Sequence, residues 1–586
     1  MTRPAHAHSY QDWIEAYDTL TEADRSAIAT RISAMEPAPL FSIVMPTYNS
    51  PERWIRRAID SVREQLYPHW ELCIADDAST APHVRALLDD YARRDSRIKV
   101  TFRAENGHIS QASNSALSLA SGQYVVLLDH DDELPSHALY MVAEEVVAHP
   151  DADIVFSDED KIDEEGRRFD PYFKSEYNPD LMLSHNMVSH LGVYRRALVE
   201  QVGKFRIGYE GSQDYDLALR CIDACGIARV RHIPFILYHW RAIVGSVALA
   251  GDQKTYAHGI ARKAIKAHLK RTSHPDATVV PTFNGNVHRV VYPLPDPPPR
   301  VSVIIPTRDK LDLLVQCIES VIAKTDYSNL ELIIVDHMSC EPATLKYLAA
   351  LAASGRARVL SYQGEYNFSD INNQAANSAT GDVLCFLNND VEAINAEWLR
   401  VMVELTTRAD VGAVGAKLYY PDGTIQHGGI VLAPAYTAWH AHKGLPRGQP
   451  GYFGRAILQQ SFSAVTAACM VVRRDVFEAV GGFDSKNLAI AYNDVDLCLR
   501  LAERGYRTVW TPYAELYHHE SATLGEPEAA PRKSQFESER LIFCQRWGRI
   551  IAADPCYSPN LAQARTDFAL AFPPRVVKPW KQAATG

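Results

Sequence analysis

The sequence predicts an α/β protein made of two tandem domains, each an open and largely parallel sheet covered by helices on both faces. An internal repeat supports the tandem arrangement, because the segments 41–47 and 71–76 recur about 260 residues later as 301–307 and 331–336. Within each copy, short and continuously apolar strands alternate with amphipathic helices, which is the pattern of a parallel sheet buried on both faces. Between the copies, the proline-rich stretch 293–299 favours extended polyproline geometry and predicts a semi-rigid linker.

The elements of the first copy follow in order from this pattern. Strands are expected at 41–46, 71–76, 98–102 and 123–128, and helices at 52–66, 82–94 and 109–120. The N-terminal stretch 10–36 has apolar positions at Trp13, Tyr17 and Leu20 and predicts helices packed on the first domain, with a cap at Thr21. Ligands of such an open sheet are expected beyond the carboxyl ends of its strands.

These observations divide the chain into five segments. We expect an N-terminal helical extension over 1–39, the first domain over 40–292, the linker over 293–299, the second domain over 300–550 and a C-terminal tail over 551–586. The repeat lengthens by about twenty residues between Asp390 and Asp494, so the second copy carries an insertion there.

Composition limits the class of protein. Of the 586 residues, 47% are hydrophobic and 22% are charged, which predicts a large folded core rather than a disordered or disulfide-held chain. The formal net charge of -11 disfavours a nucleic-acid partner, because phosphate binding needs surplus Lys and Arg. The sequence has no apolar run long enough to span a membrane and no secretory core at its N-terminus, which predicts a cytoplasmic protein with reduced cysteines.

Carboxylates are concentrated directly after the predicted strand 123–128. Asp129, Asp131 and Asp132 follow this strand, and Asn388, Asn389 and Asp390 follow the matching strand of the second copy. Taken alone, such a run is a solvated turn, since aspartate is common in turns. Its place at the carboxyl end of a parallel strand in both copies favours a site for Mg²⁺ or Mn²⁺ bound together with a diphosphate.

A second carboxylate opens a helix with the pattern D-x-D-L-x-L-R in each copy. The first aspartates of the two motifs are Asp214 and Asp494. One interpretation is a helix cap, because an aspartate in the first turn complements the helix dipole. The other is a general base, because sugar transfer with inversion needs a carboxylate to accept the proton of the acceptor hydroxyl.

Taken together, these motifs resemble the family 2 glycosyltransferases of the GT-A fold. The resemblance covers about 41–292 and 300–525, and it depends on Met-Pro-Thr-Tyr-Asn at 45–49, Ala-Asp-Asp-Ala-Ser at 75–79, the acidic turn, the Gln213-Asp214 pair and Tyr-His-Trp-Arg at 238–241. More narrowly, the chain looks like the tandem-domain enzymes of bacterial surface-polysaccharide and O-antigen synthesis.

The resemblance implies roles for matching positions in the two copies. In the first copy it implies a nucleotide-sugar site at Thr47, Asp77, Asn114 and Asp129, a metal at Asp129 and Asp131 completed by His239, and Asp214 as the base. In the second copy the implied positions are Thr307, Asp336, Asn373 and Asn388 for the nucleotide sugar, Asp390 and His518 for the metal, and Asp494 for the base. Two departures weaken the second site: His337 stands beside Asp336, and the neutral amide of Asn388 replaces the first carboxylate.

The resemblance implies an inverting, metal-dependent glycosyltransferase with two active sites. Its donors would be nucleotide-diphosphate sugars and its acceptor a growing, lipid-linked bacterial glycan, with peripheral contact at the inner face of the membrane. Two alternatives remain open. One is a single catalytic domain with a glycan-binding or scaffolding second copy, and another is a nucleotidyltransferase, although residues 46–49 lack the glycines of a phosphate loop. A processive membrane synthase is disfavoured, because it needs transmembrane helices and a Q-x-x-R-W motif.

Overall fold

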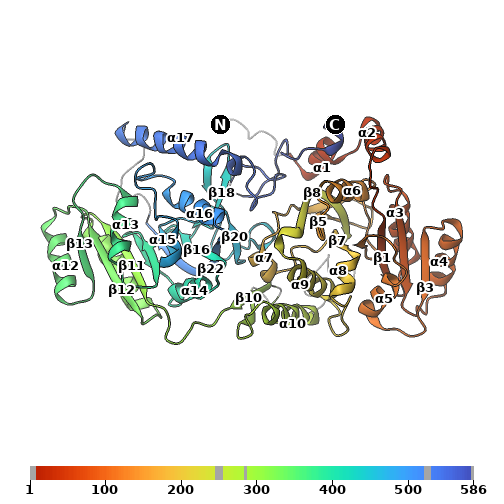
Figure 1. The fold of residues 1–586 in the computed structure, drawn as a ribbon, viewed down its shortest axis with the longest axis horizontal. Helices are drawn as coiled ribbons and strands as arrows, with labels where there is room; N and C mark the ends of the chain where they lie inside the picture. The colour runs from red at the N-terminus through yellow and green to blue at the C-terminus, as the bar shows by residue number, and fades with distance from the viewer. Residues whose placement is uncertain are drawn as a thin grey trace.

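The structure is a computed structural model that describes residues 8–243, 255–282, 285, 287–519, 530–565 and 567–582. Figure 1 shows two sheet-containing units side by side, the first at the right of the view and the second at the left. Each unit has a central sheet with helices on both faces, as the sequence predicts. No helix in the described part of the chain is both long and apolar enough to cross a membrane.

The first sheet has eight strands, and its first four confirm the predicted order of elements. These are β1 (Phe41–Thr47), β2 (Trp70–Asp76), β3 (Ile98–Phe102) and β4 (Tyr124–Leu127), which pair in parallel. The remaining strands are β5 (Ile154–Ile162), β6 (Arg168–Tyr172), β7 (Gly192–Arg195) and β8 (Val230–Arg241). The sheet order is β3-β2-β1-β4-β7-β5-β6, with β8 paired to β5. Since β7 runs antiparallel to both β4 and β5, the sheet is mixed rather than wholly parallel.

Helices cover both faces of this sheet. They are α3 (Glu52–Arg63), α4 (Pro82–Arg94), α5 (His108–Leu117), α6 (Ala138–Ala148), α7 (Pro179–Ser184), α8 (Arg196–Gln201), α9 (Gln213–Cys225) and α10 (Thr255–Arg271). The predicted N-terminal helices are confirmed as α1 (Tyr10–Trp13) and α2 (Glu22–Ser33), separated by a π-helical turn. Thr21 caps α2 as predicted, because its side chain accepts from the Asp24 amide.

The second sheet repeats the first with the same order of core strands. It runs β13-β12-β11-β14-β21-β16-β22-β15, and β11 (Val301–Thr307) pairs with β12 (Leu330–Asp336) in the same register as β1 with β2. The other strands of this path are β13 (Arg358–Ser361), β14 (Val383–Leu387), β15 (Val391–Ala393), β16 (Val411–Tyr419), β21 (Cys469–Arg473) and β22 (Arg507–His518). The repeat seen in the sequence is therefore a repeat of topology.

Helices also cover the second sheet, and an insertion extends it. The helices are α11 (Leu311–Lys324), α12 (Pro342–Ala353), α13 (Phe368–Ser378), α14 (Trp398–Thr406), α15 (Arg474–Ala479), α16 (Asn493–Glu503) and α17 (Ala530–Ala552). The insertion contains β17 (Ile425–His427), β18 (Ile430–Ala433), β19 (Thr437–His440) and β20 (Gln460–Phe462).

Contacts of the insertion and of the C-terminal segment join the two units. The Tyr452 hydroxyl donates to the Pro171 carbonyl at 2.8 Å and accepts from the Phe173 amide at 2.8 Å. Beyond α17, the chain returns to the first unit, where the Trp580 indole donates to Asp24 at 2.7 Å. A hairpin of β9 (Thr278–Thr282) and β10 (Val287–Val291) precedes the linker. The two units are thus held by packed contacts as well as by the linker.

Candidate active site

A cavity of about 510 Å³ lies in the first unit beyond the carboxyl ends of β1 and β4. Asp129 at the end of β4, His190 in the loop before β7, and Asp214 at the start of α9 all line it. Residues of α10 and His288 of β10 also line it. The cavity stands where an open α/β sheet is expected to bind its ligand.

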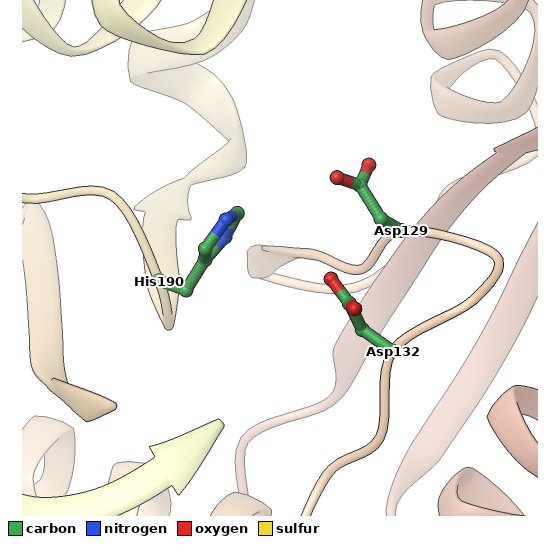
Figure 2. A group of neighbouring side chains, drawn as sticks. All are labelled: Asp129, Asp132 and His190. Carbon is green, nitrogen blue, oxygen red and sulfur yellow. The ribbon is translucent and has the colours of Figure 1, made fainter. Parts of the chain in front are cut away.

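Asp129, Asp132 and His190 form a group that could hold a metal ion. One ligand atom from each lies within 4.8 Å of the others. In Figure 2 the His190 ring faces the two carboxylates from a separate loop. Oxygen ligands with one imidazole suit a divalent cation such as Mn²⁺. The donor set therefore fits the predicted cation.

The Asp132 carboxylate has hydrogen-bond partners that the Asp129 carboxylate lacks among the described residues. It accepts from the Tyr238 hydroxyl at 2.5 Å and from the Arg241 amide at 2.7 Å. Burial raises the pKa of Asp132 well above its ordinary value, and the neighbouring Asp131 and Asp129 raise it further. Both carboxylate oxygens of Asp132 thus anchor the end of β8. Asp131, which the sequence predicts as a metal ligand, is not a member of the group formed by Asp129, Asp132 and His190.

His190 was missed by the sequence analysis. Its ring stacks on Tyr238, with ring centroids 4.3 Å apart and an interplanar angle of 9°. No local motif marks this histidine, because it reaches the acidic turn only through the pairing of β7 with β4. The second copy, aligned through the pairing of β4 with β7 and of β14 with β21, has Ala468 at this position, so the repeat does not mark this histidine either.

Asp214 lines the cavity and does not occupy the N-cap position of its helix. The N-cap position of α9 belongs to Ser212, and Asp214 accepts instead from the Asn186 side chain at 2.8 Å. Burial raises the pKa of Asp214, while the nearby His190 opposes that shift. A carboxylate with a raised pKa is a stronger base than one in water. This environment suits proton transfer.

Asp494 has a similar setting in the second unit. Tyr492 holds the N-cap position of α16, and Asp494 accepts from the Ala467 amide at 3.0 Å and from the next amide, that of Val495, at 2.8 Å. Burial raises the pKa of Asp494 as well. The second aspartates of the two motifs, Asp216 and Asp496, differ from the first because they are buried in ion pairs with arginines.

The sequence match of His239 with His518 is wrong by one residue. The backbone of Glu133 pairs with that of His239 in an isolated antiparallel β-bridge. The matching glutamate of the second copy, Glu392, pairs in the same way with Tyr517. His518 therefore corresponds to Trp240, and a shift of one residue along a strand moves a side chain to the opposite face. Tyr238 and Trp240 line the cavity, whereas the Nδ1 atom of His239 lies 2.5 Å from the buried carboxylate of Asp160.

The predicted metal residues of the second unit do lie together. His518 Nε2 is 3.3 Å from the Asp390 carboxylate and 3.5 Å from the Asn388 side-chain nitrogen. Asp390 and His518 are both buried. Each unit thus places one imidazole beside its acidic turn, from the loop before β7 in the first and from the end of β22 in the second.

The predicted nucleotide residues lie at the ends of the central strands. Thr47 and Asp77 are buried, and Asp77 pairs with Arg103 at 2.7 Å and accepts from the Gly107 amide at 2.9 Å. In the second unit, the side chain of Thr307 accepts from Asn389 at 3.0 Å.

The two nucleotide positions differ between the units. The strand registers match Asp336 with Asp76, so His337 replaces Asp77. The His337 ring bonds to the Gly364 carbonyl through Nε2 at 2.9 Å, and its buried Nδ1 has no hydrogen-bond partner in the described part of the chain. A carboxylate in one unit is therefore an imidazole in the other.

Asn114 and Asn373 hold loops rather than face the cavity. The Asn114 side chain donates to the Phe205 carbonyl at 2.8 Å and accepts from the Phe205 amide at 3.0 Å. Asn373 makes the same pair of bonds to Phe483. Because backbone groups occupy both ends of each carboxamide, their predicted contact with a nucleotide sugar gains no support.

Comparison with known proteins bears on the fold and the family. The family model described as glycosyl transferase family 2 matches residues 42–203 and again residues 302–481. An uncharacterised protein of Sinorhizobium fredii, y4gI, is 46% identical over 94% of the chain and 61% of its own length. The O-antigen biosynthesis protein RfbC of Myxococcus xanthus is 35% identical over 97% of the chain and 44% of its own length. The chain thus spans about half the length of these relatives.

Solved structures show a more distant likeness. A mannosyltransferase of Pyrobaculum calidifontis, solved with GDP-Man and Mn²⁺, is 19% identical and covers 53% of this chain and 80% of its own, with a TM-score of 0.32. The two matches of the family model coincide with the two repeated sheets. The chain therefore belongs to glycosyl transferase family 2, with two GT-A domains of that family in tandem.

Proposed function

We propose that the first domain is an inverting transferase that moves a sugar from a nucleoside-diphosphate donor to a hydroxyl of a growing glycan. The observation that carries the proposal is that Asp129, His190 and Asp214 line one cavity. The cavity thus combines ligands for a cation with a carboxylate whose pKa is raised by burial. Membership of family 2 supports the class of reaction.

Asp214 would accept the proton of the acceptor hydroxyl. The acceptor oxygen would then bond to the anomeric carbon while the bond from that carbon to the diphosphate oxygen breaks on the opposite face. The raised pKa of Asp214 favours this role, and the Asn186 side chain orients its carboxylate. The N-cap position of α9 belongs to Ser212 rather than to Asp214, which counts against the helix-cap interpretation.

Asp129 and Asp131 would hold a divalent cation, Mg²⁺ or Mn²⁺, with His190 in the position first assigned to His239. A bound cation would supply positive charge to the diphosphate leaving group. Support comes from the grouping of Asp129 with His190, and Asp131 belongs to the same turn by sequence. Thr47 and Asp77, at the ends of β1 and β2, would border the nucleotide.

For the second domain we propose a second, separate transfer. Asp494 would be its base, and Asp390 with His518 would hold its cation, with the Asn388 carboxamide as a neutral neighbour. The change from Asp77 to His337 alters the charge and the hydrogen-bonding groups near the nucleotide position. We therefore expect the two domains to differ in donor or in linkage.

The acceptor is proposed to be a lipid-linked bacterial polysaccharide at the cytoplasmic face of the membrane. The similarity to an O-antigen biosynthesis protein supports this choice. Contact with the membrane would be peripheral. The formal net charge of -11 disfavours a nucleic-acid partner.

A donor screen on the full chain tests the proposal. UDP-, dTDP- and GDP-sugars would be added with Mg²⁺ or Mn²⁺, and both the melting temperature and the release of nucleoside diphosphate would be measured. At a hundred times its dissociation constant, a true donor should stabilise the fold by about 2.7 kcal/mol, and only when the cation is present. Asp129→Asn and Asp390→Asn would assign each response to one domain. The absence of any cation-dependent response to all three donor classes would contradict the proposal.

A further inference from the structure

We infer that the second domain positions the catalytic carboxylate of the first domain through the short helix α7. The inference rests on the function proposed for Asp214 and deepens it. It assigns Asn186, which follows α7, as a positioning residue of the first site. Four residues of the second domain hold α7 and lie outside the cavity described above; we call them the clamp, and they are Arg408, Gln459, Ser461 and Arg507.

A buried ion cluster binds α7 to the second domain. Asp180, in the first turn of α7, is fully buried and forms ion pairs with Arg408 and Arg507. The Ser461 hydroxyl donates to the same carboxylate at 2.6 Å. Burial disfavours the ionised form of Asp180, but the two arginines outweigh it and hold the pKa well below its ordinary value. A carboxylate in such a cluster has little freedom to move.

Both ends of α7 are also tied by neutral hydrogen bonds. Asn178, the N-cap residue, donates to the Ser461 carbonyl at 2.8 Å and accepts from the Ser461 amide at 3.0 Å. At the other end, the Ser184 hydroxyl donates to the Gln459 carbonyl at 3.0 Å. All of these groups are buried, so water cannot readily replace the bonds. The second domain thus holds this helix of six residues at both of its ends.

The clamp acts on the active site through Asn186. This residue follows the last residue of α7 by two positions, and its side-chain nitrogen lies 2.8 Å from the Asp214 carboxylate. The loop folds back at this point, because the Asn186 carboxamide oxygen accepts from the Ser189 amide at 3.2 Å. Displacement of α7 would therefore move the hydrogen-bond donor that orients the base.

His190, by contrast, is fixed by its own domain. The buried Lys174 donates to the His190 carbonyl at 2.7 Å and to the Val188 carbonyl at 3.0 Å. The Glu159 carboxylate accepts from the His190 amide at 3.0 Å. Loss of the clamp should thus displace Asn186 from the Asp214 carboxylate and leave His190, on the cation side of the cavity, in place. The signature is a lower kcat with an unchanged KM for the donor.

The test changes a clamp residue of the second domain that lies outside both proposed sites. Arg408→Met removes one arginine and leaves Asp180 with Arg507 and Ser461, so the fold is retained. Arg447→Met is a control for the loss of an arginine ion pair elsewhere in the second domain, because Arg447 pairs with Glu515. All variants carry Asp494→Asn, so that only the first domain turns over. Arg408→Lys is the conservative rescue.

Two readouts separate the inference from the proposed function. In Arg408→Met, kcat should fall by about tenfold or more, with the donor KM changed less than about twofold, because a small misplacement of a catalytic group is costly. Amide hydrogen exchange over residues 181–190 should become faster by about tenfold. Arg408→Lys should restore part of both effects, and Arg447→Met should show neither.

Unchanged exchange over 181–190, or faster exchange with unchanged kcat, would overturn the inference. Equal effects in the Arg447→Met control would also overturn it, because they would indicate general destabilisation of the second domain. If the unmodified chain shows no transfer but Arg408→Met still speeds exchange only over 181–190, the clamp is retained and the proposed function is the part that fails.

Discussion

Replacing Asp214 by asparagine should remove catalysis by the first domain while keeping its fold. The Asn186 side chain donates to the Asp214 carboxylate, and an asparagine oxygen can accept the same bond. Burial raises the pKa of Asp214 above the unfolded value, so at neutral pH the ionised carboxylate lowers the free energy of unfolding. Asparagine removes that unfavourable contribution. We therefore expect a free energy of unfolding within about 1 kcal/mol of the unmodified protein, or slightly higher.

The expected loss is in the rate of transfer. Removing a positioned general base lowers the rate by roughly two to four orders of magnitude. This range corresponds to about 2.7 to 5.5 kcal/mol of activation free energy. Donor binding should be unchanged, because the residues proposed to border the donor lie on β1, β2 and the turn after β4. The assay is kcat and donor Kd in an Asp494→Asn background, together with chemical denaturation.

Asp216→Asn is the matched control two residues along the same helix. Asp216 is buried and forms ion pairs with Arg206 and Arg220, so its loss should cost about 3 to 5 kcal/mol of stability. The two variants should therefore fail in different ways, one in rate and the other in stability. Near-normal turnover by Asp214→Asn, or destabilisation as large as that of Asp216→Asn, would refute the reasoning and restore the helix-cap interpretation.

Three further predictions follow from the geometry of the two sites. His190→Ala should raise the Mn²⁺ concentration for half-maximal turnover of the first domain by about tenfold to a hundredfold. His239→Ala is the control and should leave that concentration unchanged, because the His239 ring lies against Asp160 instead of lining the cavity. Equal effects of both changes would restore His239 as the predicted metal ligand. Gly482→Ala should lose about 1 to 3 kcal/mol in denaturant unfolding, because the added carbon would lie 2.6 Å from the carboxamide oxygen that pins this loop. Gly481→Ala has open space and a similar backbone φ, so an equal loss there would show that backbone strain alone is responsible. Asp494→Asn should give a glycan truncated differently from that of Asp214→Asn; a product identical to that of the unmodified chain would leave the second domain without a catalytic role.

The sequence alone determined the repeat, the order of strands and helices, and the positions of the acidic turns. These features depend on local pattern: apolar runs predict the buried strands, and the strand ends predict where carboxylates gather. The register of β1 with β2, and of β11 with β12, follows the repeated segments residue by residue. Asp214 and Asp494 were found in the same way, because each opens a motif repeated in both copies.

Only the tertiary structure decided which side chains meet. His190 reaches Asp129 because β7 pairs with β4, and Asn186 reaches Asp214 because the loop after α7 folds back toward the start of α9. The sequence match of His239 with His518 was wrong for a related reason. Neighbouring residues of a strand point to opposite faces, so one extra residue before the end of β8 or β22 moves a side chain from the cavity to the opposite face of the strand. Such irregularities arise from pairing between distant strands, and local sequence pattern carries no record of that pairing.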